Sequence, residues 1–214
     1  MSFSKFIWSA IGKKVVMALT GGCLAVFLLI HLVGNSTSFW GAAAFTAYAA
    51  RLHSLGPLVP IFETGLLLIF LTHVIFAGFL YFDNLAARPR RYYRQNNAGG
   101  RTWGSRTMPY TGLVILLFVV LHLLAFRGTD PAVIATVVRG NLRNPLTALY
   151  YIASLIALII HLSHGLWSML QSLGLQGEKF VSLSRYAAGA VSVTGGIIFI
   201  AIPVLIMFYP AFLK

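Results

Sequence analysis

The stretch Leu146–Leu170 reads LTALYYIASLIALIIHLSHGLWSML and contains no Lys, Arg, Asp or Glu. A helix rises about 1.5 Å per residue, so this stretch is long enough to cross the roughly 30 Å hydrocarbon core of a bilayer. It also contains histidine, an ionisable side chain that is costly in hydrocarbon and usually marks a functional site. The stretch therefore predicts a transmembrane helix with a binding group inside the membrane.

The rest of the chain contains four more apolar runs of similar kind: Val15–Val33, Leu58–Phe82, Tyr110–Phe126 and Tyr186–Leu213. With 58% hydrophobic and 9% charged residues among 214, the chain has more apolar surface than a soluble domain could bury. We expect an all-α membrane protein with five transmembrane helices, residues 1–214 forming one integral-membrane domain. The first run is too long for a signal peptide and no small-residue cleavage site follows it, so we expect a retained helix.

The net charge of +12 is distributed beside the ends of the predicted spans. This distribution argues against nucleic-acid binding and favours a topology signal, because loops on the cytoplasmic side are enriched in Lys and Arg. With the N-terminus inside and the C-terminus outside, eleven basic residues fall on the cytoplasmic side, against five outside (Arg51, Arg127, Arg139, Arg143 and Lys214). The eleven are Lys5, Lys13, Lys14, Arg88, Arg90, Arg91, Arg94, Arg101, Arg106, Lys179 and Arg185.

Each of the first four runs contains one histidine of a regular series, and the intervals between them are 42, 49 and 39 residues (His31, His73, His122 and His161). In the expected topology, His31 and His122 lie in the outer half of the membrane, while His73 and His161 lie in the inner half. The two levels are roughly 10 to 15 Å apart, from the helical rise. In an up-down four-helix bundle these pairs are the two diagonals.

A porphyrin iron takes two axial ligands, so two histidine pairs predict two haems: an outer haem on His31 and His122, and an inner haem on His73 and His161. The chain has one cysteine, Cys23, and no Cys-x-x-Cys-His motif, so the haems would be bound non-covalently as b-type haems. A flat macrocycle also needs close backbone approach, which glycines allow, although each can equally be a packing contact (Gly21, Gly22, Gly78 and Gly112).

Three other polar residues near the spans have two interpretations each. His164 follows His161 by three residues, so either could bind iron while the other bonds a propionate or a carbonyl. His53 is expected in the outer loop beside Arg51, either solvated or active in quinone binding and proton relay. Glu63 is acidic and lies within a span, so it could pair with Arg51 or exchange protons with a quinone. We keep Glu63, Arg51 and His53 as quinone-side candidates.

Four motifs in order resemble the di-haem cytochrome b membrane anchor of succinate dehydrogenases and fumarate reductases. They are His31-Leu32-Val33-Gly34-Asn35, His73-Val74-Ile75-Phe76-Ala77-Gly78, His122 ahead of Arg127, and His161-Leu162-Ser163-His164-Gly165-Leu166-Trp167-Ser168. The resemblance covers all five spans, and the Gly-Leu-Trp-Ser ending of the last motif is its most specific part. In relatives the first histidine of that motif binds iron, so the resemblance favours His161 and places His164 beside the site.

The resemblance also implies partners. The family's anchor binds an iron–sulfur subunit and a flavoprotein that carries the dicarboxylate site, and it exchanges electrons with menaquinone or ubiquinone in the bacterial cytoplasmic membrane. This chain has no Gly-rich dinucleotide fingerprint or cysteine cluster of its own. The basic loop Arg88–Arg106 would dock the partners or contact anionic membrane lipid. Some relatives carry a glutamate for proton movement two residues before the last ligand, where this chain has Ile159.

Two other functions have different requirements for the positions of histidine. A di-haem cytochrome of the bc type has two ligand histidines about four turns apart on one helix, and no span here contains such a pair. A haem-free transporter or channel could use the histidines for proton relay or substrate binding. A spectrum of the reduced protein separates the last function from a cytochrome.

Overall fold

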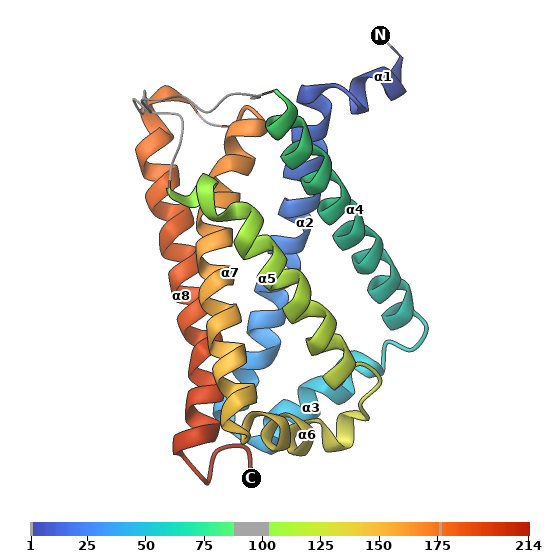
Figure 1. Ribbon diagram of the computed structural model, residues 1–214. Coiled ribbons are helices and arrows are strands. Elements are labelled where there is room, and N and C mark those ends of the chain that lie inside the picture. Colours follow the sequence, from blue (N-terminus) through green and yellow to red (C-terminus); the bar gives the residue numbers. More distant parts are fainter. Residues whose placement is uncertain (1, 88–102, 176) are drawn as a thin grey trace.

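The computed structural model describes residues 2–87, 103–175 and 177–214, and within these ranges it is helical, without strands. Five of the described helices are long and apolar enough to cross a membrane: α2 (Ala10–Ser36), α4 (Leu58–Ala86), α5 (Trp103–Phe126), α7 (Pro145–Ser172) and α8 (Val181–Phe208). They run side by side in alternating directions (Figure 1). The predicted all-α fold with five transmembrane helices is confirmed.

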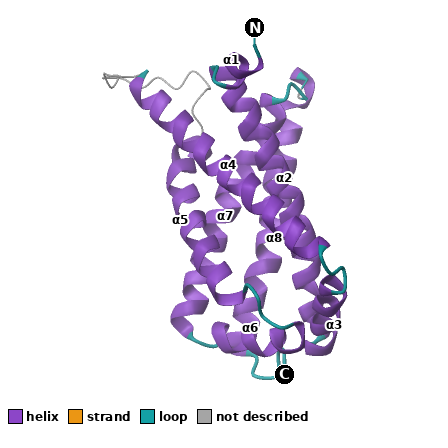
Figure 2. Cartoon of the chain, turned by 90° about the vertical axis from the view of Figure 1, so that its right-hand side faces the viewer, coloured by secondary structure: helices purple, strands orange, loops and turns teal. Residues whose placement is uncertain are grey.

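Shorter helices lie at both ends of the long ones. The first, α1 (Phe3–Ile7), lies at the end that we call the N-terminal end. At the opposite end, the C-terminal end, α3 (Ala42–His53) and α6 (Ile134–Leu142) lie close to the C-terminus (Figures 1 and 2). These two segments between the predicted spans are therefore helical and not loops. Both segments are too short to span a membrane but amphipathic, and the alanines of residues 42–50 have high helix propensity.

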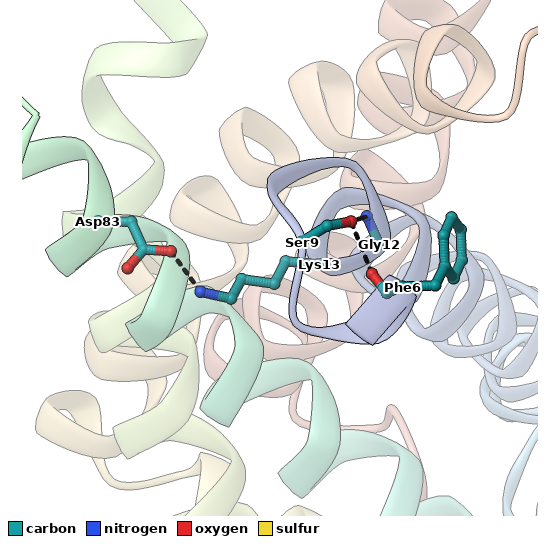
Figure 3. A network of polar contacts seen from close by, with 5 residues as sticks. All are labelled: Phe6, Ser9, Gly12, Lys13 and Asp83. Carbon is teal, nitrogen blue, oxygen red and sulfur yellow. Dashed lines mark hydrogen bonds and ion pairs between the residues drawn. The ribbon is translucent and has the colours of Figure 1, made fainter. Parts of the chain in front are cut away.

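The long helix α2 begins five residues earlier than the predicted Val15, because Ser9 caps it (Figure 3). The Ser9 hydroxyl accepts a hydrogen bond from the Gly12 amide at 3.0 Å and donates one to the Phe6 carbonyl at 2.6 Å. A Cβ on Gly12 would overlap the Phe6 carbonyl, so the sharp turn from α1 into α2 requires glycine. One turn into α2, Lys13 pairs with Asp83 of α4 at 2.5 Å.

The last span ends at Phe208, five residues before the predicted Leu213. Tyr209 is extended (φ −118°, ψ 92°) because it precedes Pro210, and the residue before a proline is disfavoured in helical conformation. The chain then turns back, with the Arg139 guanidinium donating to the Pro210 carbonyl at 2.8 Å and Leu213 buried in the apolar cluster at this end.

The packing of the long helices leaves one side of the bundle loosely filled. The strongest contacts join α7 to α8 and α5, and α2 to α4 and α7. In this order, α4–α2–α7–α5, α2 lies diagonally from α5 and α4 from α7, the side between α4 and α5 is open, and α8 packs against α7 and α2. No residue of α4 is buried, and of α5 only Thr111 is. The inner faces of α4 and α5 are therefore open to further packing.

Candidate haem-binding sites

The histidines His31 on α2 and His122 on α5 lie next to each other across one diagonal of the bundle. Their ring centroids are 6.0 Å apart and the ring planes are nearly perpendicular, at 85°. Each ring packs against a phenylalanine one turn earlier on its own helix: Phe27 at 5.4 Å from His31, and Phe118 at 5.5 Å from His122. Tyr151 of α7 adds a hydroxyl 3.3 Å from Nδ1 of His122. The two predicted outer ligands are thus brought together.

The histidines His73 on α4 and His161 on α7 lie nearer the N-terminal end, within electrostatic range of each other. Each bonds to a threonine of the neighbouring helix. Nδ1 of His73 is 3.0 Å from Oγ1 of Thr20 on α2, and Nδ1 of His161 is 3.1 Å from Oγ1 of Thr111 on α5. The two predicted inner ligands therefore lie across the other diagonal, each with the same type of partner.

The two threonines determine which ring nitrogen is protonated. The Thr20 hydroxyl is 2.7 Å from the Val16 carbonyl, and the Thr111 hydroxyl is 3.0 Å from the Thr107 carbonyl. A hydroxyl has one proton to donate, and here it goes to the carbonyl of its own helix. With the hydroxyl proton on that carbonyl, the histidine Nδ1 is the donor and the threonine oxygen is the acceptor. We assign this tautomer to both rings, and it leaves Nε2 unprotonated and able to bind a metal.

The threonines belong to a repeat that sequence analysis missed. Residues 20–31 and 111–122 share the pattern Thr-Gly-x5-Phe-x3-His. The histidines of the pattern are the outer pair, and its phenylalanines are the ones that pack against them. In both helices the threonine precedes the outer histidine by 11 residues, or about 16 Å of helical rise. Because the spacing is the same in both helices, an alignment of the first span with the third would have found this pattern. The two helices thus present the same groups at the same two levels.

Iron with two axial imidazoles fits this geometry. Metal–imidazole bonds are about 2 Å long and the ring centroid lies roughly 1 Å behind the nitrogen, so two axial rings have centroids about 6 Å apart. The measured separation of His31 and His122 is 6.0 Å. Glycine follows each threonine, and an added Cβ would lie 3.2 Å from Cε1 of His73 at Gly21 and 3.6 Å from Cε1 of His161 at Gly112. The backbone at Gly21 is thus closer to the His73 ring than a Cβ would comfortably allow, whereas at Gly112 a Cβ would make an ordinary contact with His161.

The other two predicted glycines do not face the histidines. A Cβ on Gly22 would meet the Met169 sulfur at 2.9 Å, and one on Gly78 would meet no described atom within 4 Å. Gly22 is therefore a helix-packing contact. In the described ranges, no three or more His, Cys, Asp or Glu side chains converge to hold a metal ion.

Donors without partners lie at the N-terminal end of the bundle. The indole Nε1 of Trp167 and the guanidinium Nε of Arg106 are buried and make no hydrogen bond to the described residues. Trp167 contacts the His164 ring at 5.8 Å and lies under the Arg185 guanidinium at 5.4 Å. Buried donors of this kind need acceptors, and the carboxylates of haem propionates are suitable ones. The residues present thus fit haem at this level too.

The two histidines of α7 have different surroundings. His161 contacts Thr111 and interacts with His73, whereas His164 packs against the backbone of Gly104 and against Trp167. The side chain of Ile159 faces away from both, since it fills the space that a Cβ on Gly196 of α8 would occupy. His161 is therefore the member of the motif that is directed toward the inner diagonal.

The quinone-side candidates are exposed. Arg51 and His53 belong to the last turn of α3, so the expectation that His53 lies in a loop is wrong; its Nδ1 is 3.2 Å from the Ala49 carbonyl of the same helix. Glu63 is exposed in the second turn of α4. Among the described residues the ion pair is Lys13–Asp83, so the alternative of a Glu63–Arg51 pair is not formed. The basic residues Arg88 to Arg101 lie outside the described residues.

The chain is similar to a known family of membrane proteins. Residues 87–208 match the model of the family described as succinate dehydrogenase/fumarate reductase transmembrane subunit. The chain belongs to this family. The matched part of this cytochrome b membrane-anchor subunit includes α5, α7 and α8, and with them His122 and His161. The resemblance read from the four histidine motifs is confirmed at the level of the family.

A curated relative extends the similarity beyond the family match. The anchor subunit is 27% identical over 162 residues to the succinate dehydrogenase cytochrome b558 subunit of Bacillus subtilis strain 168. The alignment covers 71% of this chain and 74% of the relative. No solved structure matches the chain.

Proposed function

We propose that this anchor subunit passes electrons across the bacterial cytoplasmic membrane, between an iron–sulfur subunit at its N-terminal end and a membrane quinone near its C-terminal end. Two b haems would be held by the inner pair, His73 and His161, and the outer pair, His31 and His122. Bound haem supplies reversible one-electron iron chemistry. The dicarboxylate site would belong to the flavoprotein subunit of the same complex, and the whole of residues 1–214 would act as one membrane domain.

The observation that carries this proposal is the pairing of histidines at two levels on opposed helices. Two ligands at each level match the two axial positions of iron, and the repeat on α2 and α5 separates the levels by 11 residues, or about 16 Å. A single redox centre would need only one such pair.

The chain's own residues would orient the ligands and exclude water. Thr20 and Thr111 hold the Nδ1 protons of the inner pair, so that Nε2 of each ring points away from the threonine. Phe27 and Phe118 cover one face of each outer ring. Arg106 and Trp167 offer unpaired donors to carboxylates at the N-terminal end. These contacts supply ligation, orientation and charge compensation.

The positions of the basic residues support an N-terminus in the cytoplasm. The start of α2, which carries Lys13, and the start of α8, which carries Arg185 and follows Lys179, lie at the N-terminal end (Figure 1), and eleven of the sixteen Lys and Arg residues would then be cytoplasmic. That end would face the iron–sulfur partner, with basic residues also touching anionic lipid.

The test is a difference spectrum of the purified complex, made by co-expressing this chain with its flavoprotein and iron–sulfur partners. We expect b-type absorption after dithionite and a content of two haems per chain. Succinate should reduce part of this haem. A spectrum without haem would support a transporter or channel instead, and one haem per chain would contradict the two-level pairing.

A further inference from the structure

An ion pair joins α2 to α4 at the N-terminal end of the bundle, apart from the contacts of the histidines. The Lys13 ammonium lies 2.5 Å from the Asp83 carboxylate (Figure 3). The two members differ in their surroundings, because the Lys13 side chain is 12% exposed and the Asp83 side chain is 54% exposed. The positive charge of the pair is therefore mostly buried, and its negative charge is mostly exposed.

Two aromatic rings also contact the ammonium group of Lys13. Its Nζ lies over both rings, 6.0 Å from the ring centroid of Trp8 and 5.7 Å from that of Phe79. The two rings meet edge to face at 5.2 Å, and Phe76 stacks on Trp8 at 6.1 Å. An aromatic face attracts a cation and takes the place of water around it. The Lys13 charge is thus held in a defined place and has few contacts with water.

Lys13 lies on the face of α2 that also carries the contacts of both histidine levels. It precedes Thr20 by 7 residues and His31 by 18, which are close to two and five full turns of a helix. Residues at such spacings share one helix face. Because Thr20 bonds to Nδ1 of His73, Lys13 lies two turns, or about 10 Å of helical rise, beyond the inner level.

A fixed charge at this position acts on a redox centre at the inner level. A positive charge favours the gain of an electron and so raises a midpoint potential, whereas a negative charge lowers it. Two unit charges about 10 Å apart change an equilibrium constant roughly tenfold at an effective dielectric constant of about 20. A buried charge is screened less than an exposed one, so the effect of Lys13 exceeds that of Asp83.

We infer that the Lys13–Asp83 pair raises the midpoint potential of the inner haem and so favours the inner level as the first acceptor of electrons from the iron–sulfur partner. This inference rests on the proposed function, because the inner haem is the one on His73 and His161. Each transfer takes one electron from the partner and converts ferric iron to ferrous iron, and the ion pair gains and loses no proton. Lys13 and Asp83 act on the iron through space and do not bind it.

Redox titration of the purified complex tests the inference with two variants of opposite effect. Lys13→Met removes the positive charge at similar side-chain length, so it should lower the inner potential by up to the 59 mV that a tenfold change means for one electron. Asp83→Asn removes the negative charge and should raise the inner potential by a smaller amount. The outer potential should change less in both variants, because the outer level is about 16 Å further along α2. The inner component is the one that is lost in His161→Ala.

The opposite signs separate an effect of charge from an effect of structure. If the pair only holds α2 against α4, both variants break it, and the inner potential should shift in the same direction or stay unchanged. Either result overturns the inference. If Lys13→Met gives no complex that contains haem, Asp83→Asn decides the question: a higher inner potential supports the inference, and an unchanged or lower one overturns it.

The neighbouring lysine provides the matched control. Lys14 is exposed and lies about 100° further around α2, so Lys14→Met should shift the inner potential by less than half as much as Lys13→Met. Lys13→Arg keeps the charge and should leave the inner potential close to that of the wild type. Equal shifts in Lys13→Met and Lys14→Met overturn the inference, because the net charge of this end would then be the cause.

Haem content separates this inference from the proposed function. If the wild-type complex contains two haems that titrate, but neither Lys13→Met nor Asp83→Asn shifts the inner potential, only the role of the ion pair is wrong. If the wild-type complex contains no haem, or succinate reduces none of it, the proposed function itself fails and this inference fails with it.

Discussion

The two levels of histidines are held by different kinds of contact. At the inner level, both rings are hydrogen-bonded to threonines at 3.0 and 3.1 Å. At the outer level, the rings touch each other and four phenylalanines (Phe27, Phe118, Phe126 and Phe199), and the hydrogen bond to Tyr151 is longer, at 3.3 Å. Directional bonds fix the tautomer and rotation of a ring, whereas aromatic packing fixes mainly its position. The inner histidine rings are therefore oriented by hydrogen bonds, and the outer rings mostly by aromatic packing.

The largest expected effect is the loss of one haem when a ligand is removed. We expect His161→Ala to lose the inner haem, because His161 is the histidine of α7 that interacts with His73, and to halve the reduced b-type absorption. His164→Ala, the matched control three residues away, should keep both haems because His164 faces Gly104 and Trp167. Pyridine haemochrome analysis gives the content. Equal haem in the two variants would refute the assignment of His161.

The same measurement at the outer level completes the comparison. His31→Ala should also remove one haem and leave the other with an unchanged spectrum, because the two levels are separated by about 16 Å of helix. Loss of both haems in this variant would mean that the levels do not bind independently.

The transmembrane spans could be predicted because they are long apolar runs, and the histidine series because one histidine recurs in each of the first four runs. A run of apolar residues has to be helical in lipid, where no water can satisfy the backbone. The ends of the spans were less predictable, since they depend on single contacts. Ser9 extends α2 toward the N-terminus, and Pro210 stops α8 early. Helices α3 and α6 were missed because short amphipathic segments carry a weak hydropathy signal.

The candidate ligands of the site were predicted from the sequence, but the residues that contact these ligands were missed. Histidine in hydrocarbon is conspicuous, so His31, His73, His122 and His161 were found one by one, and their roles as iron ligands stay predictions. Threonine is common in transmembrane helices and usually bonds its own helix, so Thr20 and Thr111 gave no signal singly. Only the repeated spacing to histidine distinguishes them.

Removal of a threonine hydroxyl should weaken the inner level alone. We expect Thr111→Val to lower inner-haem affinity by about 10- to 100-fold, as for other lost partners of metal-bound histidine. It should also raise the inner midpoint potential by about 40 mV, because a ring that no longer donates a hydrogen bond is a weaker base. Redox titration of the isolated complex measures this shift.

Two variants define the cause of that effect. Thr111→Ser keeps the hydroxyl and should restore the wild-type potential. Thr72→Val is the matched control, because Thr72 is adjacent to His73 but, among the residues that the structure describes, its hydroxyl donates to the Leu68 carbonyl of its own helix and not to a histidine. If Thr72→Val shifts the potential as much as Thr111→Val does, the effect is a general one of threonine loss and not of the bond to histidine.

The two glycines of the repeat should differ in their tolerance of a methyl group. A Cβ on Gly21 would lie 3.2 Å from Cε1 of His73, closer than ordinary contact, whereas one on Gly112 would lie 3.6 Å from Cε1 of His161. We therefore expect Gly21→Ala to displace the His73 ring and to reduce haem retention severalfold, with Gly112→Ala close to wild type. Haem content after detergent extraction compares them, and an equal loss in both variants would contradict the difference in contact distance.

The smallest expected effect lies at the outer level. If Nε2 of His122 binds iron, its Nδ1 carries the proton and donates it to the Tyr151 oxygen, so Tyr151→Phe removes an acceptor, as the threonine variants do. The bond is long, and a weak hydrogen bond is worth about 0.5 kcal/mol, or about 20 mV for one electron. We expect the outer potential to rise by that amount and the inner potential to stay fixed. A larger shift than in Thr111→Val would reverse the comparison, because the outer ring would then depend on its hydrogen bond more than the inner ring does.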